Sequence, residues 1–238
     1  MTRHSSARQV AICLLVLGLV ATGYAIWVLV GTNVVAHHRA GLLVERTRDS
    51  WARGEASSVE AIVRIPRFGD DWAYPVVNGT DDAALARGVG RDTGSAKPGE
   101  VGNLVLAAHR ITHGQPFNNF PDLRAGDRVY VDTKSATYVY ELRNGGRDIE
   151  VDADVSWPLQ PVPSPASGGE PAREAMITLI TCADLFPSGN RNVVIGDLVA
   201  TTPGSVGGVG RSSGARSASP YEPRPMPAGQ EPGTGASL

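Results

Sequence analysis

Two residues that could act together in nucleophilic chemistry, Cys182 and Arg191, lie nine positions apart in the segment ITLITCADLFPSGNRNVVIGDL. The apolar run Met176–Thr181 predicts a strand that ends at Cys182, and Arg191 begins the next apolar run. If the two strands pair as antiparallel neighbours across the short link Ala183–Asn190, both residues lie at the same end of the sheet. A guanidinium beside a cysteine favours the reactive thiolate and can stabilise an oxyanion.

A thiol that attacks an amide also needs a proton donor for the leaving amine, and histidine is the side chain best suited to this near neutral pH. Two of the five histidines lie in the central part of the chain, His109 and His113. The others fall before or beside the predicted N-terminal span: His4, His37 and His38. Because His109 follows the apolar run Asn103–Ala108, we expect it at a strand end close to Cys182 and Arg191.

Other interpretations of the same residues stay open at this point. A cysteine after an apolar strand is commonly a small core residue, and a single histidine or arginine is commonly structural. His109, His113 and Cys182 also have the ligand types of a zinc site, although Gly114 and Pro116 argue against the helix that this spacing would need. The segment Gly88–Gly94 misses the dinucleotide-binding spacing and opens no helix.

The elements that must position these residues are short strands. Six apolar or β-branched runs are separated by clusters of Gly, Pro, Asn and Asp: Ala61–Ile65, Asn103–Ala108, Arg128–Asp132, Thr137–Leu142, Met176–Thr181 and Asn192–Ala200. This pattern predicts an all-β barrel or sandwich. Asp81–Arg87 is predicted as a short helix, and the Pro-, Ser- and Gly-rich segment Ser156–Glu174 as a long loop.

The N-terminal part contains 21 uncharged residues, Val10–Val30, which is long enough for a transmembrane helix. A cleaved signal peptide is the alternative, but its apolar region is typically shorter. We expect an uncleaved anchor with the N-terminus in the cytoplasm and the following domain outside the cell. Cys13 lies inside this span, which leaves Cys182 without an intramolecular partner in the soluble part.

The whole chain of 238 residues carries a net charge of −2 and has no basic run, so we expect no nucleic-acid binding. Beyond residue 202 the sequence is rich in Gly, Ser and Pro, which predicts disorder. The expected organisation is a short cytoplasmic segment at 1–9, an anchor at 10–30, a partly helical stalk or linker at 31–60, a domain at 61–202 and a tail at 203–238.

Several blocks of the sequence resemble the sortases, a family of cysteine transpeptidases. Thr178–Cys182 resembles the family's TLxTC signature, and Arg191 stands where sortases have their essential arginine. Further blocks resemble the histidine strand, the opening strand, the turn before the histidine strand and the L-x-x-G-D turn: Asn103–Arg110, Arg64–Phe68, Pro98–Asn103 and Leu123–Asp127. The pattern is most similar to the class E sortases of actinobacteria.

The resemblance implies a closed β-barrel of about eight strands with short helices. Cys182 would attack the threonine carbonyl of an LPxTG- or LAxTG-like sorting motif, His109 would protonate the departing glycine amine, and Arg191 would stabilise the oxyanion. A lipid-linked peptidoglycan precursor amine would then accept the surface protein, with a pilin lysine or water as alternative acceptors. His113 and Thr181 are candidates to bind substrate, although Thr181 would equally serve strand packing. No metal or cofactor is implied.

Two other functions remain alternatives. A cell-wall cysteine hydrolase would share the nucleophile and the histidine, but it normally places the cysteine at the start of a helix rather than after a β-branched strand. A non-catalytic, membrane-anchored β-domain that binds a wall component would not need Cys182 at all.

Overall fold

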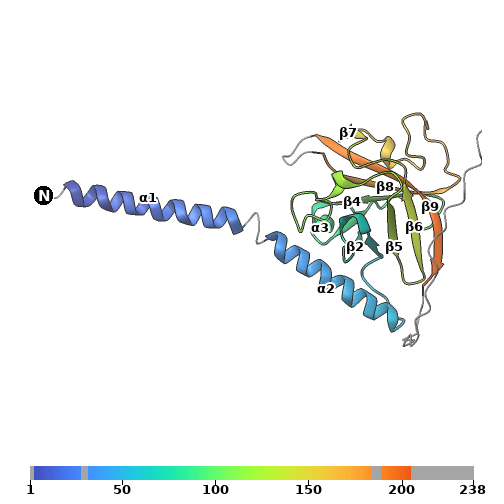
Figure 1. Cartoon of the computed structure of the whole chain (residues 1–238), viewed down its shortest axis with the longest axis horizontal. Coiled ribbons are helices and arrows are strands. Elements are labelled where there is room, and N and C mark those ends of the chain that lie inside the picture. Colours follow the sequence, from blue (N-terminus) through green and yellow to red (C-terminus); the bar gives the residue numbers. More distant parts are fainter. Residues whose placement is uncertain (1–2, 28–31, 184–188, 205–238) are drawn as a thin grey trace, which may run out of the picture. The chain divides into compact units, whose positions relative to one another are not determined.

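The computed structural model describes residues 3–27, 32–183 and 189–204. Two long helices come first, and short strands and helical turns follow (Figure 1). The helices are α1 (Arg3–Ile26), α2 (Thr32–Ala52) and α3 (Asp82–Leu85), and the 3-10 turns are η2 (Pro66–Phe68), η3 (Phe120–Asp122) and η4 (Trp157–Leu159). The strands are β1 (Ala61–Arg64), β2 (Ala73–Asn78), β3 (Val89–Arg91), β4 (Gly102–Ala107), β5 (Arg128–Asp132), β6 (Ala136–Leu142), β7 (Glu150–Asp152), β8 (Ala175–Cys182) and β9 (Asn190–Pro203).

The strands form a closed barrel. Their order is β6-β5-β1-β2-β3-β4-β8-β9, and β6 also pairs with β9, which completes a ring of eight strands. The strand β7 lies outside this ring and pairs with the first residues of β9. The predicted all-β class and closed barrel of about eight strands are therefore confirmed.

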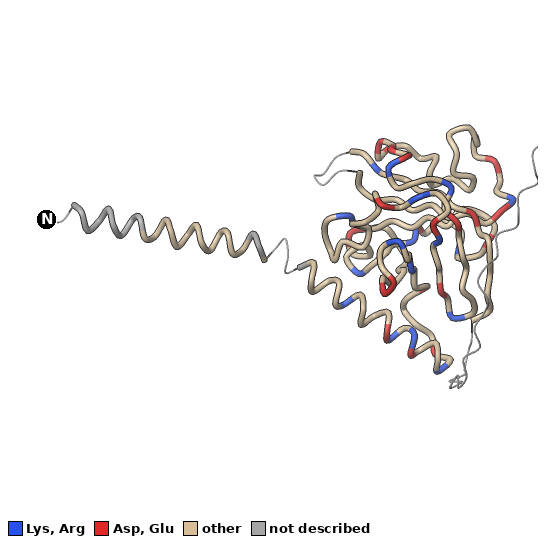
Figure 2. The backbone as a smooth tube through the Cα atoms, in the orientation of Figure 1, with Lys and Arg blue, Asp and Glu red and all other residues tan. Residues whose placement is uncertain are grey.

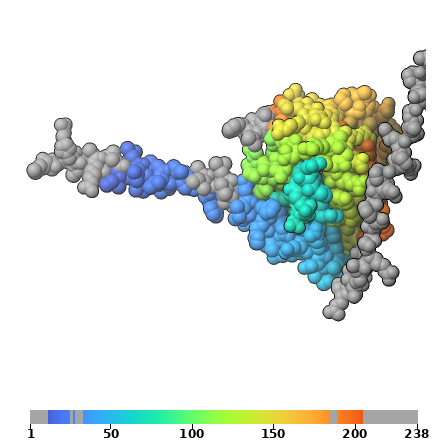
Figure 3. Space-filling model, viewed as in Figure 1, coloured from blue at the N-terminus to red at the C-terminus, as the bar shows by residue number. Residues whose placement is uncertain are grey.

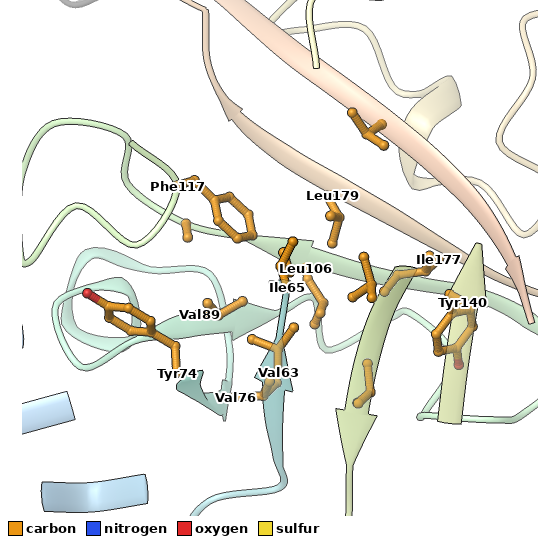
Figure 4. Close-up of a cluster of buried hydrophobic side chains, with 14 of the residues drawn as sticks. Val63, Ile65, Tyr74, Val76, Val89, Leu106, Phe117, Tyr140, Ile177 and Leu179 are labelled. Carbon is orange, nitrogen blue, oxygen red and sulfur yellow. The ribbon is translucent and has the colours of Figure 1, made fainter. Parts of the chain in front are cut away.

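The core lies inside the barrel because inward-facing positions alternate along each strand. Leu104 and Leu106 of β4 and Ile177 and Leu179 of β8 belong to one buried cluster, part of which Figure 4 shows. Their neighbours on the other face of β4 and β8 point away from that cluster. We call the face of β4, β8 and β9 that points away from the barrel core the outer face.

The helix α2 packs on the barrel rather than standing apart from it (Figure 3). Ala40, Val44 and Thr47 recur at helical spacing and are all buried, and Ala40 belongs to the core cluster. The stalk predicted over 31–60 is thus helical over most of its length, and its apolar face covers the domain.

The N-terminal helix α1 includes most of the predicted span Val10–Val30, and residues 28–30 of that span lie outside the described residues. Among the described residues, no helix meets the length and hydropathy needed to cross a membrane. The tail predicted to be disordered also lies outside the described part, apart from Pro203 and Gly204.

Acidic and basic residues are interspersed along the backbone of the barrel, as Figure 2 shows. Most of the ion pairs join neighbouring strands or turns, among them Arg64 with Asp132 and Arg67 with Asp127. Arg91 differs from the other charged residues in these ion pairs because its side chain is buried, and it pairs with Glu60.

Candidate active site

Cys182 and Arg191 are direct partners in the antiparallel pairing of β8 with β9. The hairpin register extends one position further, where the Ala183 N–H donates a hydrogen bond of 3.1 Å to the Asn190 carbonyl. Directly opposed residues of an antiparallel pair project from the same face of the sheet. The register therefore sets the sulfur and the guanidinium on one face, although residues 184–188 of the predicted link lie outside the described residues.

That face is the outer one. Ile177 and Leu179 of β8 and Val194 of β9 face the core, so the alternating positions Cys182 and Arg191 face outward. Both side chains are half-buried, and the Arg191 Nη1 donates a hydrogen bond of 3.0 Å to the Asn190 carbonyl. A half-buried cysteine on the outside of a barrel is accessible in a way that a core cysteine is not.

His109 reaches the same end of the sheet from β4, which runs parallel to β8. The last pair of that register is Ala107 with Ile180, and the Ala108 N–H then donates to the Ile180 carbonyl at 3.2 Å. The Thr181 hydroxyl donates to the Ala108 carbonyl at 2.9 Å. His109 and Cys182 are the next residues after Ala108 and Thr181, so the three predicted strand ends do converge.

Thr181 lies beneath this end of the sheet. It is 3% exposed, and its hydroxyl is the group that holds Ala108. This position fits the strand-packing alternative for Thr181 more directly than contact with a substrate.

The His109 side chain is half-buried. Its Nε2 is buried and has no hydrogen-bond partner among the described residues. The ring of His113 stacks on it, with 4.7 Å between centroids and 26° between planes. Burial, followed by the neighbouring His113, lowers the pKa of His109 below its ordinary value, and Asp82 opposes this shift.

His113 itself is exposed and has a backbone φ of 53°, in the left-handed region. Its stacking places it directly beside His109, and its predicted contact with substrate stays a prediction. Within the described residues no cluster of three or more His, Cys, Asp or Glu side chains could hold a metal ion. His109, His113 and Cys182 thus do not form the zinc site that their residue types would allow.

Arg110 is a site residue that the sequence reasoning did not single out. Its Nη1 donates a hydrogen bond to the carbonyl of Ala183, the residue after Cys182. Its Nε is buried and unpartnered within the described residues. Arg110, which follows His109, is therefore hydrogen-bonded to Ala183, which follows Cys182, and this contact links the two strand ends. The only sequence signal for this role is the position of Arg110 directly after His109.

A cavity of about 160 Å³ lies on the outer face beside Arg191. We call it the outer-face cavity. Its floor is formed by side chains of β4, β8 and β9, and its rim by β7, η4 and the segment between them. The lining residues are Thr80, Asp92, Val105, Ala107, Val151, Asp152, Ala153, Val155, Pro158, Leu159, Ile180, Arg191 and Val193. The loop predicted over Ser156–Glu174 contributes Pro158 and Leu159, whereas the strand β7 was not expected from the sequence.

Asn103 holds this rim against the sheet. Its Nδ2 donates to the carbonyls of Pro158 and Gln160, both at 2.9 Å. Its Oδ1 accepts a hydrogen bond of 2.8 Å from the Thr178 hydroxyl on β8. Asn103 and Thr178 are both buried on the outer face, so η4 covers them and they in turn fix the position of η4.

Known proteins are similar to this chain over most of its length. The sortase domain model matches residues 63–199. The chain is 35% identical over 206 residues to Sortase SrtE1 of Streptomyces coelicolor, an alignment that covers 81% of this chain and 56% of that protein. It is 29% identical over 212 residues to Sortase SrtE2 of the same organism, covering 79% of this chain and 80% of the relative. The chain thus spans a little over half the length of SrtE1.

Solved structures show the same fold. Sortase E from Streptomyces avermitilis is 33% identical with a TM-score of 0.54, and the match covers 61% of this chain and 91% of that chain. Sortase E1 from Streptomyces coelicolor, solved with a tripeptide in its active site, is 30% identical with a TM-score of 0.53 over 61% of this chain and 91% of that one. The chain belongs to the sortase family, whose members are cysteine transpeptidases, and its similarity includes class E sortases.

Proposed function

We propose that this sortase cleaves an LPxTG- or LAxTG-like motif between threonine and glycine through a thioacyl intermediate on Cys182. The thiolate attacks the threonine carbonyl carbon, and the carbon–nitrogen bond to glycine breaks as the tetrahedral intermediate collapses. His109 gives its proton to the departing glycine amine. The observation that supports these roles best is the convergence of His109, Cys182 and Arg191 at neighbouring strand ends on one face of the sheet.

Arg191 has the electrostatic role in this proposal. Its side chain projects from the same face of the sheet as the nucleophile. There the guanidinium stabilises the thiolate before attack and the oxyanion afterwards. The transition state gains negative charge on the carbonyl oxygen, so a fixed cation at this position lowers the barrier without the need for reorganisation.

The second half-reaction transfers the acyl group. An amine of a lipid-linked peptidoglycan precursor attacks the thioester, an amide forms, and Cys182 leaves as the thiolate with which the first half-reaction began. His109, now neutral, accepts the proton from the attacking amine. The surface protein that carried the motif is then joined to the cell wall.

We place the substrate on the outer face. The outer-face cavity borders Arg191 and is largely apolar, with Val105, Ile180 and Leu159 in its lining, which suits an apolar residue of the motif. The tripeptide reported in the active site of the Streptomyces coelicolor relative supports a peptide groove in this fold. His113, exposed beside His109, is the further residue that we assign to substrate contact. For Thr181 we favour strand packing.

We further propose that residues 61–202 form the catalytic domain, that it acts outside the cell, and that residues 10–30 anchor it in the membrane with residues 1–9 in the cytoplasm. The support is the uncharged sequence Val10–Val30 and the exposed apolar side chains of α1, including Leu14, Leu17 and Leu19. Membrane fractionation of the expressed full chain, followed by protease accessibility from outside, tests the anchor and the location of the domain outside the cell. Recovery in the soluble fraction would contradict the anchor and leave the chemistry untouched.

The experiment that tests the reaction uses the purified full chain in detergent, a set of peptides with threonine-glycine bonds, and an amine acceptor. Mass spectrometry is expected to detect an acyl adduct on Cys182 and an amide product that appears only with the amine. Release of the free acid at the same rate with and without the amine would identify a hydrolase instead. Absence of any adduct on Cys182, with Cys182→Ala as the reference, would contradict the proposed function altogether.

A further inference from the structure

The first turns of α2 touch the segment that carries His113. The Gly114 N–H donates a hydrogen bond of 3.1 Å to Oδ1 of Asn33, and Nδ2 of the same side chain donates to the Ile111 carbonyl at 3.4 Å. One amide group on the helix thus engages two backbone positions of the segment 111–114, which begins two residues after His109 in the sequence.

A second contact reaches the same glycine from the barrel. The Tyr74 hydroxyl on β2 donates to the Gly114 carbonyl at 2.8 Å and lies 2.8 Å from Nδ1 of His37 on α2. A phenol has only one proton to donate, and Tyr74 gives it to Gly114. The Nδ1–H of His37 is therefore the donor in the contact between His37 and the Tyr74 oxygen. Both backbone polar groups of Gly114 are therefore held, one by α2 and one by a tyrosine that α2 also contacts.

Tyr74 is a rigid support. It is 2% exposed, and its ring packs against Trp72 and His37 with centroid distances of 5.1 and 5.7 Å. Figure 4 shows Tyr74 at one edge of the core cluster, with its hydroxyl pointing away from the other labelled side chains. Burial raises the pKa of Tyr74 to about 12, so its hydroxyl keeps its proton across the neutral range.

The backbone held in this way is in an uncommon conformation. His113, Gly114 and Gln115 have φ values of 53°, 84° and 51°, all in the left-handed region. For residues with a side chain this region costs energy, and it persists where the surroundings enforce it. A Cβ on Gly114 would lie 3.0 Å from the backbone nitrogen of His37 and 3.3 Å from Ala36. The backbone of α2 is therefore in direct contact with this glycine.

We propose that α2 and Tyr74 position the catalytic histidine, by fixing Gly114 so that the adjacent His113 ring is held in its stack on His109. The proposal rests on the proposed role of His109 as the acid. Asn33, Tyr74 and His37 act through the backbone and through His113, so they are positioning residues and do not touch the substrate. The helix that follows the N-terminal segment thereby influences the rate of the chemistry, beyond covering the barrel.

The test uses the full chain and compares Tyr74→Phe and Asn33→Ala with Asn33→Asp. The aspartate keeps an oxygen for the Gly114 N–H and loses only the longer contact to the Ile111 carbonyl, so it is the conservative variant that should retain most of the activity. His38→Ala is the matched control, because His38 is an exposed histidine on the same helix. Two readouts are needed: kcat and KM for a threonine-glycine peptide with an amine, and the NMR titration midpoint of His109.

In Tyr74→Phe and Asn33→Ala we expect kcat to fall about 10-fold, with KM within about twofold, since small misplacements of an acid act on the chemical step. We expect the His109 midpoint to rise towards the ordinary value of about 6.5, because a released ring is better solvated. Asn33→Asp should stay within about threefold of the parent chain, and His38→Ala should match it.

An unchanged kcat and an unchanged His109 midpoint in both variants would overturn the positioning role. The same holds if the variants lose only thermal stability, because that result would reduce the contacts to packing. If the parent chain itself shows no cleavage, the proposed function fails, and the NMR midpoint alone then decides whether α2 and Tyr74 position His109.

Discussion

Cys182 on β8 and Arg191 on β9 are opposed residues of an antiparallel pair. They lie at the end of the sheet where β4, the parallel neighbour of β8, also ends and His109 follows. Position in the register, rather than a flexible loop, thus determines the distance between sulfur and guanidinium. A site built on paired strands is held more firmly than one built on loops, which suits an electrostatic role that depends on preorganisation.

The first prediction concerns Arg191→Lys. Lysine keeps the charge but lacks the planar fork of donors that can contact both the thiolate and the oxyanion. We expect kcat to fall about 10²–10³-fold, the range typical for loss of an oxyanion donor, with circular dichroism unchanged. Single-turnover kinetics of acyl adduct formation on Cys182 measures this directly. Turnover within threefold of the parent chain would remove the oxyanion role assigned to Arg191.

The second prediction concerns the titration of His109. Burial is the main cause of its lowered pKa and the adjacent His113 is the second, so the NMR midpoint should lie below about 6.5. His113→Tyr keeps an aromatic ring for stacking and removes the competing positive charge. We expect the midpoint to rise in this variant without reaching 6.5, because burial remains. A midpoint at or above 6.5 in the parent chain would contradict the buried position of the ring.

The same shift has a consequence for stability. The folded state binds a proton to His109 less readily than the unfolded state does, so unfolding is favoured by protonation. The contribution of His109 to stability is therefore complete above about 6.5 and declines as the pH falls from there towards the folded midpoint. His109→Gln should remove this part of the pH dependence, which denaturant titrations between pH 5 and 7.5 can measure.

Much of the fold is predictable from short-range sequence pattern. The six predicted runs correspond to β1, β4, β5, β6, β8 and β9, and Asp81–Arg87 contains α3. Apolar or β-branched runs between clusters of Gly and Asp are typical of strands, whose backbone hydrogen bonds are made with a neighbouring strand. The closure of the ring by β6 and β9 involves residues more than fifty positions apart, and only the family resemblance indicated it.

Three strands were missed, each for a physical reason. The strand β2 contains Pro75, which lacks an N–H and normally argues against a strand. Val89–Arg91 and Glu150–Asp152 are three residues long, with a glycine at the centre of one and acidic residues at both ends of the other. Segments this short carry no periodicity of their own, and their pairing with longer neighbours decides their conformation.

The candidate site was accessible to sequence reasoning where it depends on strand ends. Cys182, Arg191 and His109 each follow or begin an apolar run, so their convergence needed only the pairing of three strands. The roles of Arg110 and Asn103 depend on hydrogen bonds to carbonyls far away in the sequence, Arg110 to Ala183 and Asn103 to Pro158 and Gln160. No local pattern encodes such contacts.

The third prediction concerns the buried Arg91, whose side chain is 6% exposed. Its guanidinium donates to Glu60 at 2.6 Å and also to Asn78 and to the carbonyls of Asp92 and Ser95. Glu60→Gln removes the compensating charge and leaves the arginine buried. We expect a loss of about 2 kcal/mol in the free energy of unfolding, less than for a fully buried pair because Glu60 is partly exposed.

Denaturant unfolding of the purified chain measures this loss. The matched control is Glu55→Gln, which removes the carboxylate from the exposed pair of Arg53 with Glu55 and should leave the unfolding midpoint unchanged. Equal effects of the two substitutions would show that burial of Arg91 is not what makes its ion pair important. Peptide cleavage should persist in both variants wherever the chain is folded, since neither residue belongs to the candidate site.

The last prediction concerns the hydrogen bond from Thr178 to Asn103, which lies beneath η4 and the outer-face cavity. Thr178→Val keeps the shape of the side chain but leaves the Asn103 Oδ1 buried without its donor, at a cost of about 1–3 kcal/mol. The same Asn103 side chain holds Pro158 and Gln160, so loss of its support from β8 should loosen the rim of the cavity. We therefore expect KM for the sorting peptide to rise about 3- to 10-fold with little change in kcat, as for lost ground-state binding.

The control for this prediction is Thr137→Val on β6. The Thr137 hydroxyl donates to Asp132 away from the site, so this substitution should leave KM unchanged. If Thr178→Val lowers stability while KM stays at the parent value, then the rim held by Asn103 does not bind the substrate, and the peptide must lie elsewhere on the outer face.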